Sequence, residues 1–247
     1  MVKQNCVAAI IQARMTSSRL PGKVLMALEG ESVLDHMIRR VRQSESISRV
    51  IVATTRNKED DPIVELCESI SVDYYRGEEE DVLGRMYQAA ATTDCDSIVR
   101  LTGDCPMIDP EIIDKIIAKY RTGDFDYVSN TKLRTFPDGL DVEVFTFEAL
   151  LEAHSRAQHG YLREHVTPYI SGSKPEYGSG TFRVGFYSHD CDLSHIRWTL
   201  DTYEDYKRIK AIVEKLPDDY KWLDALSLAT KHPEFLGTQT KCSFVTG

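Results

Sequence analysis

The stretch CVAAIIQARMTSSRLPGK, residues 6–23, decides the class of fold. Residues 6–11 form an apolar run that is typical of a buried strand, and the polar loop that follows carries Arg14, Arg19 and Lys23. In parallel sheets, ligands bind in the crevice outside the carboxyl ends of the strands. A cationic loop directly after a buried strand is therefore a candidate binding loop for an anion.

The first half of the chain continues as an alternation of short strands and amphipathic helices. We expect strands at residues 6–11, 49–55, 72–76, 96–104 and 126–130, and helices at 32–43, 60–70, 80–93 and 109–120. Apolar residues in the helix at 32–43 recur on one face of a 3.6-residue period. Such alternation predicts βαβ units, and hence an α/β fold with a doubly wound, mainly parallel sheet.

The alternation breaks at residue 131. We expect a strand and a helix over 139–154, a helix over 160–172, a strand over 179–188, and a returning strand and helix over 196–216. The segment SGSKPEYGSG, residues 171–180, is the most loop-like of the chain and suits a flexible loop or a dimer arm. We therefore expect one domain over 1–247, with 131–196 inserted as an arm.

Composition limits the partners. The 247 residues are 42% hydrophobic and carry a formal net charge of −9, which argues against a general nucleic-acid binder or an anionic-membrane binder but allows a local anion site. The six cysteines lack a CxxC pair, so reduced thiols are expected. Without a signal-like start or an apolar run of about 18 residues, the sequence predicts a soluble, cytoplasmic protein.

The loop after the first strand has the side chains that bind a triphosphate. Arginines bind phosphate oxygens bidentately, a glycine lets the backbone approach, and hydroxyls add hydrogen bonds. The loop offers these groups in Arg14, Ser18, Arg19, Gly22 and Lys23. It is neither a GxxxxGK[ST] loop nor a GxGxxG fingerprint. A solvated basic loop is the alternative interpretation.

Two aspartates are candidate Mg²⁺ ligands. Asp104, in RLTGDCPMIDP (100–110), lies at the end of an expected strand, and a carboxylate beside a triphosphate is favourable when a cation bridges them. An Asx turn or a helix cap is the alternative, although Asp109 fits the cap better. Asp201, in WTLDTYEDYKRI, fits a helix cap better than a metal ligand on the sequence pattern alone.

A third group of polar residues could bind the second substrate. FPDGLDVEVF (136–145) carries Asp138, Asp141 and Glu143, the last two on one face of an expected strand, and LREHVTPY adds Glu164 and His165. These side chains could bind hydroxyls, an amine or a carboxylate of an acceptor. Turn chemistry and a solvated helix face explain them equally well.

Several of these motifs, taken in order, resemble a known family. IIQARMTSSRLPGK (10–23) resembles the N-terminal signature of the cytidylyltransferases that activate acidic sugars, typified by CMP-KDO synthetase and CMP-N-acetylneuraminate synthetase. RLTGDCPMIDP, PDGLDVEVF, REHVTPYI and RWTLDTYEDY resemble most the branch typified by spore coat polysaccharide biosynthesis protein F. The resemblance covers about residues 6–215. It departs at TGDCP, where the sialic-acid and KDO enzymes generally read QGDEP.

The resemblance implies a Rossmann-like nucleotidyltransferase fold of the nucleotide-diphospho-sugar transferase type, and assigns roles to residues. It implies a nucleotide-binding set of Ala13, Arg14, Ser18, Arg19, Gly22, Lys23 and Arg100. Arg14, Lys23 and Asp104 would be catalytic, Asp104 and Asp201 would hold Mg²⁺, and 131–196 would bind the acceptor and mediate a homodimer. The expected activity is transfer of CMP from CTP to an acidic sugar or related acid, with release of pyrophosphate.

Two other functions stay open at this point. A glycosyltransferase could share the nucleotide-binding half, but the chain reads GDC where such enzymes carry a DxD motif. A nucleotide-binding module without turnover is the third possibility, which the intact set of Arg14, Lys23, Asp104 and Asp201 disfavours.

Overall fold

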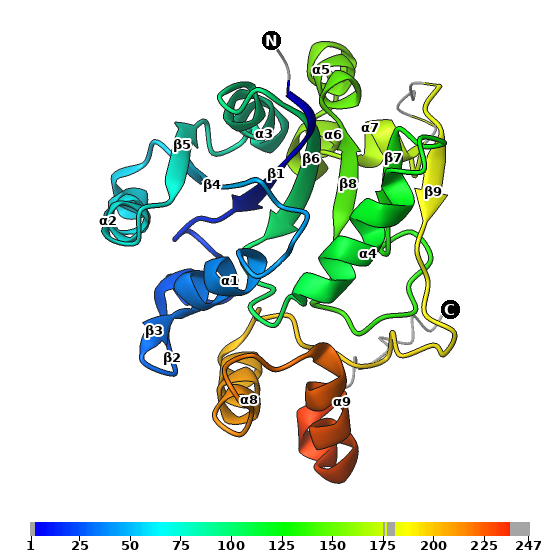
Figure 1. The fold of residues 1–247 in the computed structure, drawn as a ribbon. Helices are drawn as coiled ribbons and strands as arrows, with labels where there is room; N and C mark the ends of the chain where they lie inside the picture. Colours follow the sequence, from blue (N-terminus) through cyan, green and yellow to red (C-terminus); the bar gives the residue numbers. More distant parts are fainter. Residues whose placement is uncertain (1–2, 175, 177–180, 238–247) are drawn as a thin grey trace, which may run out of the picture.

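The computed structural model of the protein describes residues 3–174, 176 and 181–237. In this part of the chain the main sheet has seven strands in the order β5-β4-β1-β6-β8-β7-β9, and only β8 runs against the others (Figure 1). The strands are β1 (Lys3–Gln12), β4 (Arg49–Thr55), β5 (Asp73–Gly77), β6 (Cys95–Thr102), β7 (Tyr127–Ser129), β8 (Glu143–Thr146) and β9 (Val184–Phe186). The predicted doubly wound, mainly parallel sheet is confirmed.

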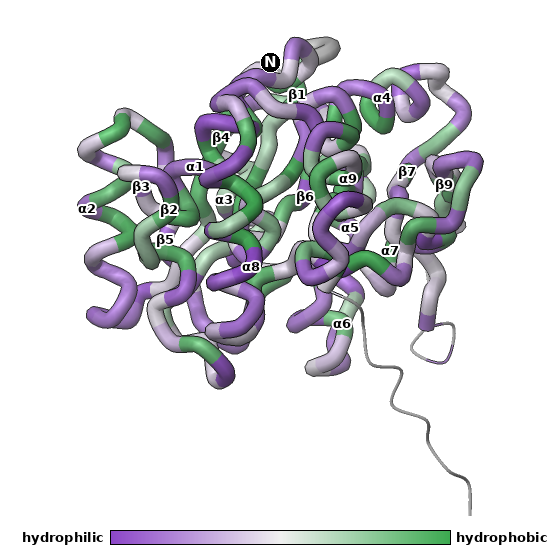
Figure 2. The backbone as a smooth tube through the Cα atoms, turned by 90° about the horizontal axis from the view of Figure 1, so that it is seen from below, coloured by the Kyte–Doolittle hydropathy of each residue, from purple (hydrophilic) through white to green (hydrophobic). Residues whose placement is uncertain are grey.

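Helices cover both faces of this sheet and bury two apolar clusters. One cluster takes residues from α1 (Val33–Val41), α2 (Asp61–Ser69), α4 (Pro110–Tyr120), α8 (Tyr203–Val213) and α9 (Trp222–Lys231). The other takes residues from α3 (Val82–Ala91), α5 (Phe147–Arg156), α6 (Gly160–His165) and α7 (Pro168–Ser171). Along the flanking helices hydrophobic and hydrophilic residues alternate (Figure 2), as expected for helices with one buried face.

Side-chain caps fix where the helices begin. The carboxylate of Asp109 accepts hydrogen bonds from the backbone N–H groups of Glu111 and Ile112, at 2.8 and 3.2 Å, so the predicted cap of α4 is confirmed. Helix α8 is capped by Thr202 in a capping box with Asp205. The alternative interpretation of Asp201 as that cap is therefore wrong, and its carboxylate is available for other partners.

The strand order creates a crevice beside β1. From β1 the chain builds β4 and β5 on one side and then returns to place β6 on the other side. The order of the strands therefore reverses between β1 and β6, and open α/β sheets bind ligands outside the carboxyl ends of the strands at such a point. Residue 200 lies next to the loops after β1 and β6, since the Leu200 N–H donates to the Asp104 carbonyl at 2.8 Å and the Leu200 carbonyl accepts from Lys23 Nζ at 2.7 Å.

Residues 131–196 are part of the main sheet rather than a separate arm. They supply β8, which pairs with both β6 and β7, and β9, which pairs with β7. The loop-like segment at 171–180 lies largely outside the described residues. The acceptor-binding and dimer-forming roles of 131–196 stay predictions.

Two further findings bear on the sequence predictions. Cys6 and Cys95, on the neighbouring strands β1 and β6, form a disulfide, so the prediction of reduced thiols is wrong for this pair. Cys67, Cys105 and Cys191 are free. Among the residues that the structure describes, no helix has the length and apolar character needed to cross a membrane.

Candidate functional site

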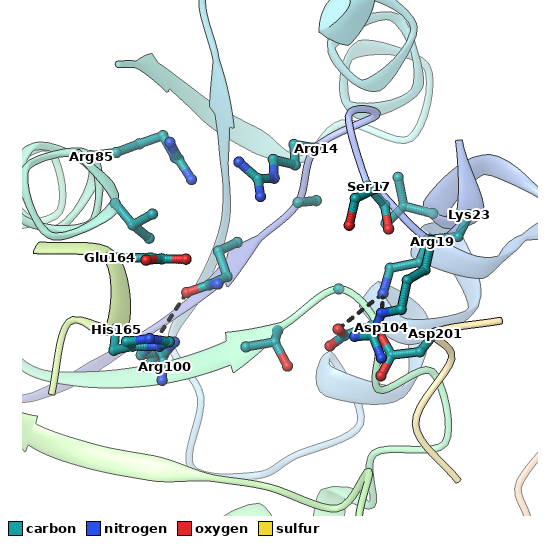
Figure 3. A pocket seen from close by; sticks show the side chains of 17 residues that line it. Arg14, Ser17, Arg19, Lys23, Arg85, Arg100, Asp104, Glu164, His165 and Asp201 are labelled. Carbon is teal, nitrogen blue, oxygen red and sulfur yellow. Dashed lines mark hydrogen bonds and ion pairs between the residues drawn. The ribbon is translucent and has the colours of Figure 1, made fainter. Parts of the chain in front are cut away.

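A cavity of about 270 Å³ opens at the carboxyl ends of β1 and β6. Ten of the predicted site residues line it: Ala13, Arg14, Ser18, Arg19, Lys23, Arg100, Asp104, Glu164, His165 and Asp201. They come from the β1 loop, β6, α6 and the segment before α8. Figure 3 shows Lys23, Arg19, Asp104 and Asp201 gathered at one end and Arg85, Glu164, His165 and Arg100 at the other.

Lys23 is the centre of the first end. Its Nζ donates to Asp104 Oδ2 at 3.1 Å, to Asp201 Oδ1 at 3.0 Å and to the Leu200 carbonyl at 2.7 Å. The side chain is only 10% exposed, so these bonds form in a partly desolvated setting where charge pairing is stronger. Arg19 adds an ion pair to Asp201 Oδ1 at 2.8 Å. The ammonium therefore joins the loops after β1 and β6 to the C-terminal segment.

Asp201 is held in its ionised form. Burial on its own raises the pKa of this carboxyl, but hydrogen bonds from Arg197 and Lys23, with the charges of Lys23 and Arg19, lower the pKa below its ordinary value. Arg197 Nη2 lies 2.7 Å from Asp201 Oδ2. A carboxylate, and not a neutral acid, therefore faces the Lys23 ammonium at neutral pH.

The pair of carboxylates fits a hard cation such as Mg²⁺. Mg²⁺ usually takes one or two protein carboxylates and completes its shell with water and substrate phosphates. Asp104 and Asp201 converge on one positive charge, and Asp104 is 29% exposed towards the cavity. No group of three or more His, Cys, Asp or Glu side chains that could hold a metal gathers in the described part of the chain, this cavity included. The metal itself stays a prediction.

Two acidic residues that the sequence did not single out shape the cationic loop. Buried Asp60 accepts from the Met15 N–H at 2.7 Å and also binds the hydroxyls of Thr54 and Thr55. Glu79 accepts from the Thr16 hydroxyl and from Arg14 Nη1 at 3.2 Å. Both contacts join residues more than 40 positions apart, so local sequence patterns did not reveal them.

Gly22 shapes the loop without lining the cavity. Its φ of 72° is in the left-handed region, and its N–H donates to the Met15 carbonyl at 2.9 Å. Glycine adopts this conformation without strain, whereas most other residues do not. Gly22 therefore closes the loop and sets the direction in which Lys23 leaves it.

Arg85 is a cavity residue that sequence reasoning missed. It lies on α3, is 3% exposed, and donates from Nη1 to the carbonyls of Glu78 and Glu79. Its Nε is buried without a hydrogen-bond partner. Val82, Arg85, Met86 and Ala89 occupy the i, i+3, i+4 and i+7 positions of the buried face of α3. An arginine on an otherwise apolar helix face is the sequence signal that could have identified Arg85 as a site residue.

Three predicted acceptor residues do not line the cavity. Asp141 pairs with Arg134 at 2.8 Å, and Asp138 pairs with Arg134 at 3.4 Å and with Arg197 at 3.6 Å. Glu143 is buried against Arg100. These three carboxylates pair with arginines of this chain and do not line the cavity with Glu164 and His165, and their role towards the acceptor stays a prediction.

Comparison with known proteins gives one consistent picture. The family model described as cytidylyltransferase matches residues 8–227. An uncharacterised protein of Methanocaldococcus jannaschii is 42% identical over 203 residues, 81% of this chain and 80% of that protein. Spore coat polysaccharide biosynthesis protein SpsF of Bacillus subtilis is 33% identical over 241 residues, 93% of this chain and 96% of that protein.

A solved structure agrees. The structure of a cytidylyltransferase from Leptospira borgpetersenii superimposes with a TM-score of 0.87 at 35% identity and covers 95% of this chain and 98% of that one. The sheet, the cationic loop and the match over most of the chain together decide the assignment. The chain belongs to the cytidylyltransferase family and is a nucleotidyltransferase.

Proposed function

We propose that the protein transfers CMP from CTP to an acidic sugar or a related acid and releases pyrophosphate, with Mg²⁺ as cofactor. The observation that carries the proposal is the convergence of Lys23, Asp104 and Asp201 beside the cationic loop 13–19. They meet at the carboxyl ends of β1 and β6, between which the order of the strands reverses. A triphosphate needs cations and backbone N–H groups on one side and a metal held by carboxylates on the other. This cavity offers the cationic side chains and the two carboxylates, which supports the proposal.

The residues of this chain bind and orient the two substrates. A hydroxyl oxygen of the acceptor attacks the α-phosphorus of CTP in line, the bond from that phosphorus to the β-phosphate oxygen breaks, and pyrophosphate departs. Arg14, Arg19 and Lys23 offset the negative charge that develops on the phosphate oxygens. They do so from fixed positions, because Glu79 and Asp201 already bind Arg14 and Arg19.

Asp104 and Asp201 would hold the Mg²⁺. When bound, the ion would neutralise the triphosphate and polarise its oxygens. Their carboxylates reach the same point from β6 and from the C-terminal segment, so the site is complete only when both segments are in place.

The acceptor class and the setting are part of the proposal. The motif resemblance to acidic-sugar cytidylyltransferases supports an acidic acceptor, and the name of the relative SpsF, with its reference to spore coat polysaccharide, supports a role in surface polysaccharide biosynthesis. We also expect a cytoplasmic homodimer, which sedimentation velocity of the purified protein tests.

A pyrophosphate-release screen tests the activity. Each of the four nucleoside triphosphates is incubated with Mg²⁺ and a panel of sugar acids and small hydroxy acids, including 3-deoxy-manno-octulosonate and N-acetylneuraminate. We expect release only when CTP and one acceptor class are both present. Release with UTP or ATP in preference to CTP would contradict the choice of nucleotide.

The same screen separates the other possibilities. Tight CTP binding without any product over the whole panel would support a module without turnover. Transfer from a nucleotide sugar, in the absence of CTP, would support a glycosyltransferase. Chelation of the divalent metal by EDTA should stop release, and restoration by Mg²⁺ completes the test of the cofactor.

A further inference from the structure

Arg100 is fixed in the wall of the cavity by partners on two other strands. It lies on β6, and its Nη1 pairs with Glu143 on β8 while its Nε donates to Gln12 Oε1 on β1 at 3.1 Å. Its side chain is 14% exposed and lines the cavity, as does His165 (Figure 3). Among the described residues nothing accepts a hydrogen bond from Nη2, so this group is available to a ligand.

Glu143 already accepts hydrogen bonds from three donors of this chain. Its Oε1 accepts from the Tyr127 hydroxyl and from the Thr167 hydroxyl, both at 2.6 Å, and its Oε2 accepts from Arg100. The residue is 7% exposed and stands directly opposite Arg100 in the β6–β8 register. Burial of a carboxylate is unfavourable unless hydrogen bonds offset it, and here three donors do so. Glu143 is therefore held in place by Tyr127 and Thr167 and in turn fixes the orientation of the Arg100 guanidinium.

The backbone beside Thr167 is strained. Val166 has φ 68° and ψ −63°, and the Thr167 N–H donates to the His165 carbonyl at 2.8 Å, which is a tight γ-turn of the rare, positive-φ kind. A β-branched residue there stores on the order of 1–3 kcal/mol. The turn directs the Thr167 hydroxyl to Glu143 and leaves His165 in the cavity wall.

The nature of the ligand follows from the charge of Arg100. The triphosphate is accounted for by the loop 13–23 and the Asp104 end of the cavity. The remaining partners for Arg100 are the uncharged cytosine ring and the acceptor. A guanidinium held in a fixed orientation matches a carboxylate or phosphate group, which it binds through two parallel N–H donors.

We infer that Arg100 binds the ionised group of the acceptor and that Glu143 is the positioning residue that holds it there, braced by Tyr127 and Thr167. The sequence predicted that Glu143 contacts the acceptor directly, whereas in this assignment Glu143 acts on the acceptor through Arg100. Arg100, which the resemblance placed on the nucleotide, selects acceptors that carry an anionic group. This assignment rests on the proposed function for the identity of the acceptor.

The first test separates the two substrates kinetically. Glu143→Gln keeps the size of the side chain and its Oε1 acceptor but removes the charge that holds Arg100. We expect the KM for the acceptor to rise roughly 10- to 100-fold, as for a lost charge-assisted hydrogen bond, with the KM for CTP within about twofold. Arg100→Lys should act in the same direction, and the double variant should add little to either single change.

If Glu143 and Arg100 only stabilised the fold, their variants would change the KM values for both substrates alike. Glu111→Gln, an exposed carboxylate on α4, serves as the matched control and should change neither KM. Equal changes in both KM values, or a change confined to the KM for CTP or to the choice of nucleotide, would overturn the assignment. An acceptor amide tested beside its acid adds a direct check, because the amide should lose its disadvantage in Arg100→Gln, which removes the positive charge.

The second test needs no turnover. The side-chain Nε–H signal of Arg100 in a ¹H–¹⁵N spectrum, identified by its absence in Arg100→Lys, should shift on addition of 3-deoxy-manno-octulosonate, N-acetylneuraminate or inorganic phosphate, and not on addition of CTP. A shift with CTP alone, or with none of the probes, would overturn the inference. If the pyrophosphate screen fails while this signal still responds to an acid, the proposed transfer is wrong and the anion site stands.

Discussion

At the scale of single residues, Asp104 joins the cationic loop to the C-terminal segment. Its carboxylate accepts from Lys23, and its carbonyl accepts from Leu200, so it contacts both the cationic loop and the C-terminal segment. Only the charge of the side chain, and not its volume, is needed for the proposed metal role. A substitution that removes the charge and keeps the shape therefore separates catalysis from folding.

We expect Asp104→Asn to lower kcat by at least 10²–10³-fold, the range for loss of one group that stabilises transition-state charge. The amide oxygen can still accept from Lys23, so the melting temperature should change little. Pyrophosphate release measures the first effect and thermal unfolding the second. Near-normal, Mg²⁺-dependent release by this variant would contradict the assignment of Asp104 as a metal ligand.

Val166 offers a second test at this scale, because alanine is usually more stabilising than glycine at a buried position and the positive φ of Val166 should reverse that order. Both Val166→Ala and Val166→Gly lose the packing of a fully buried side chain, but only glycine is relaxed at φ 68°. We expect Val166→Gly to be more stable than Val166→Ala by about 1 kcal/mol in urea unfolding. At Val144, inside β8, the alanine variant should be more stable than the glycine variant. If alanine is the more stable variant at Val166 as well, the backbone there is not strained.

At the scale of elements, a bidentate ion pair between Asp81 and Arg163 joins α3 and α6. Arg163 Nε and Nη2 donate to the two oxygens of Asp81 at 2.8 and 2.7 Å, and Asp81 caps α3 by accepting from the Gly84 N–H at 2.9 Å. Burial raises the pKa of Asp81, but the Arg163 hydrogen bonds and the Gly84 N–H bring that pKa below its ordinary value. The pair places α6, with Glu164 and His165, against the helix that carries Arg85.

Gly84 is the sensitive point of this junction. A Cβ there would lie 2.7 Å from Asp81 Cγ, too close for the capping carboxylate to stay in place. We expect Gly84→Ala to lower the free energy of unfolding by about 1–2 kcal/mol through loss of the cap, despite the higher helix propensity of alanine. Gly160→Ala in α6, where no atom lies within 4 Å of the added Cβ, should be neutral or stabilising.

The helices and strands show what the sequence could predict. Periodicity and apolar runs identified β1, β4, β5 and β6 and the helices between them, and ten of the residues that the motifs singled out line one cavity. Pairing between distant segments was not readable in the same way. Asp141 meets Arg134 and Glu143 meets Arg100 because β8 inserts between β6 and β7, and no local pattern specifies that strand order.

At the scale of the whole molecule, a buried histidine couples stability to pH. His36 on α1 is almost fully buried, with Nδ1 at 2.7 Å from Glu31 Oε1 and at 3.1 Å from Arg39 Nη2, and Nε2 at 3.3 Å from the Tyr220 hydroxyl. Arg40 lies over the Tyr220 ring. Burial, with the charges of Arg40 and Arg39, outweighs Glu31 and lowers the pKa of His36 from 6.5 to about 4.

The sign of the effect follows from proton uptake on unfolding. Between pH 6.5 and about 4 the unfolded chain binds a proton at His36 that the folded protein does not, so stability falls as the pH falls through this window. The loss attributable to His36 is about 3 kcal/mol. Urea unfolding from pH 7 to 4 measures it, and His36→Gln should flatten this slope. An unchanged slope would show that other groups titrate there.

The order in which the chain emerges during synthesis has a consequence for this enzyme. Lys23 Nζ and Asp201 Oδ1, 3.0 Å apart, are separated by 178 positions, and Asp104 lies between them in the chain. A ribosome adds about 5–20 residues per second, so the parallel strands and the cationic loop are made well before the segment that supplies Asp201. Nascent chains that stop short of residue 201 hold the phosphate loop without one of the two carboxylates that face it. With Asp201 as the proposed metal ligand, we expect chains that stop short of residue 201 to lack transfer activity, so that this activity would arise late in synthesis.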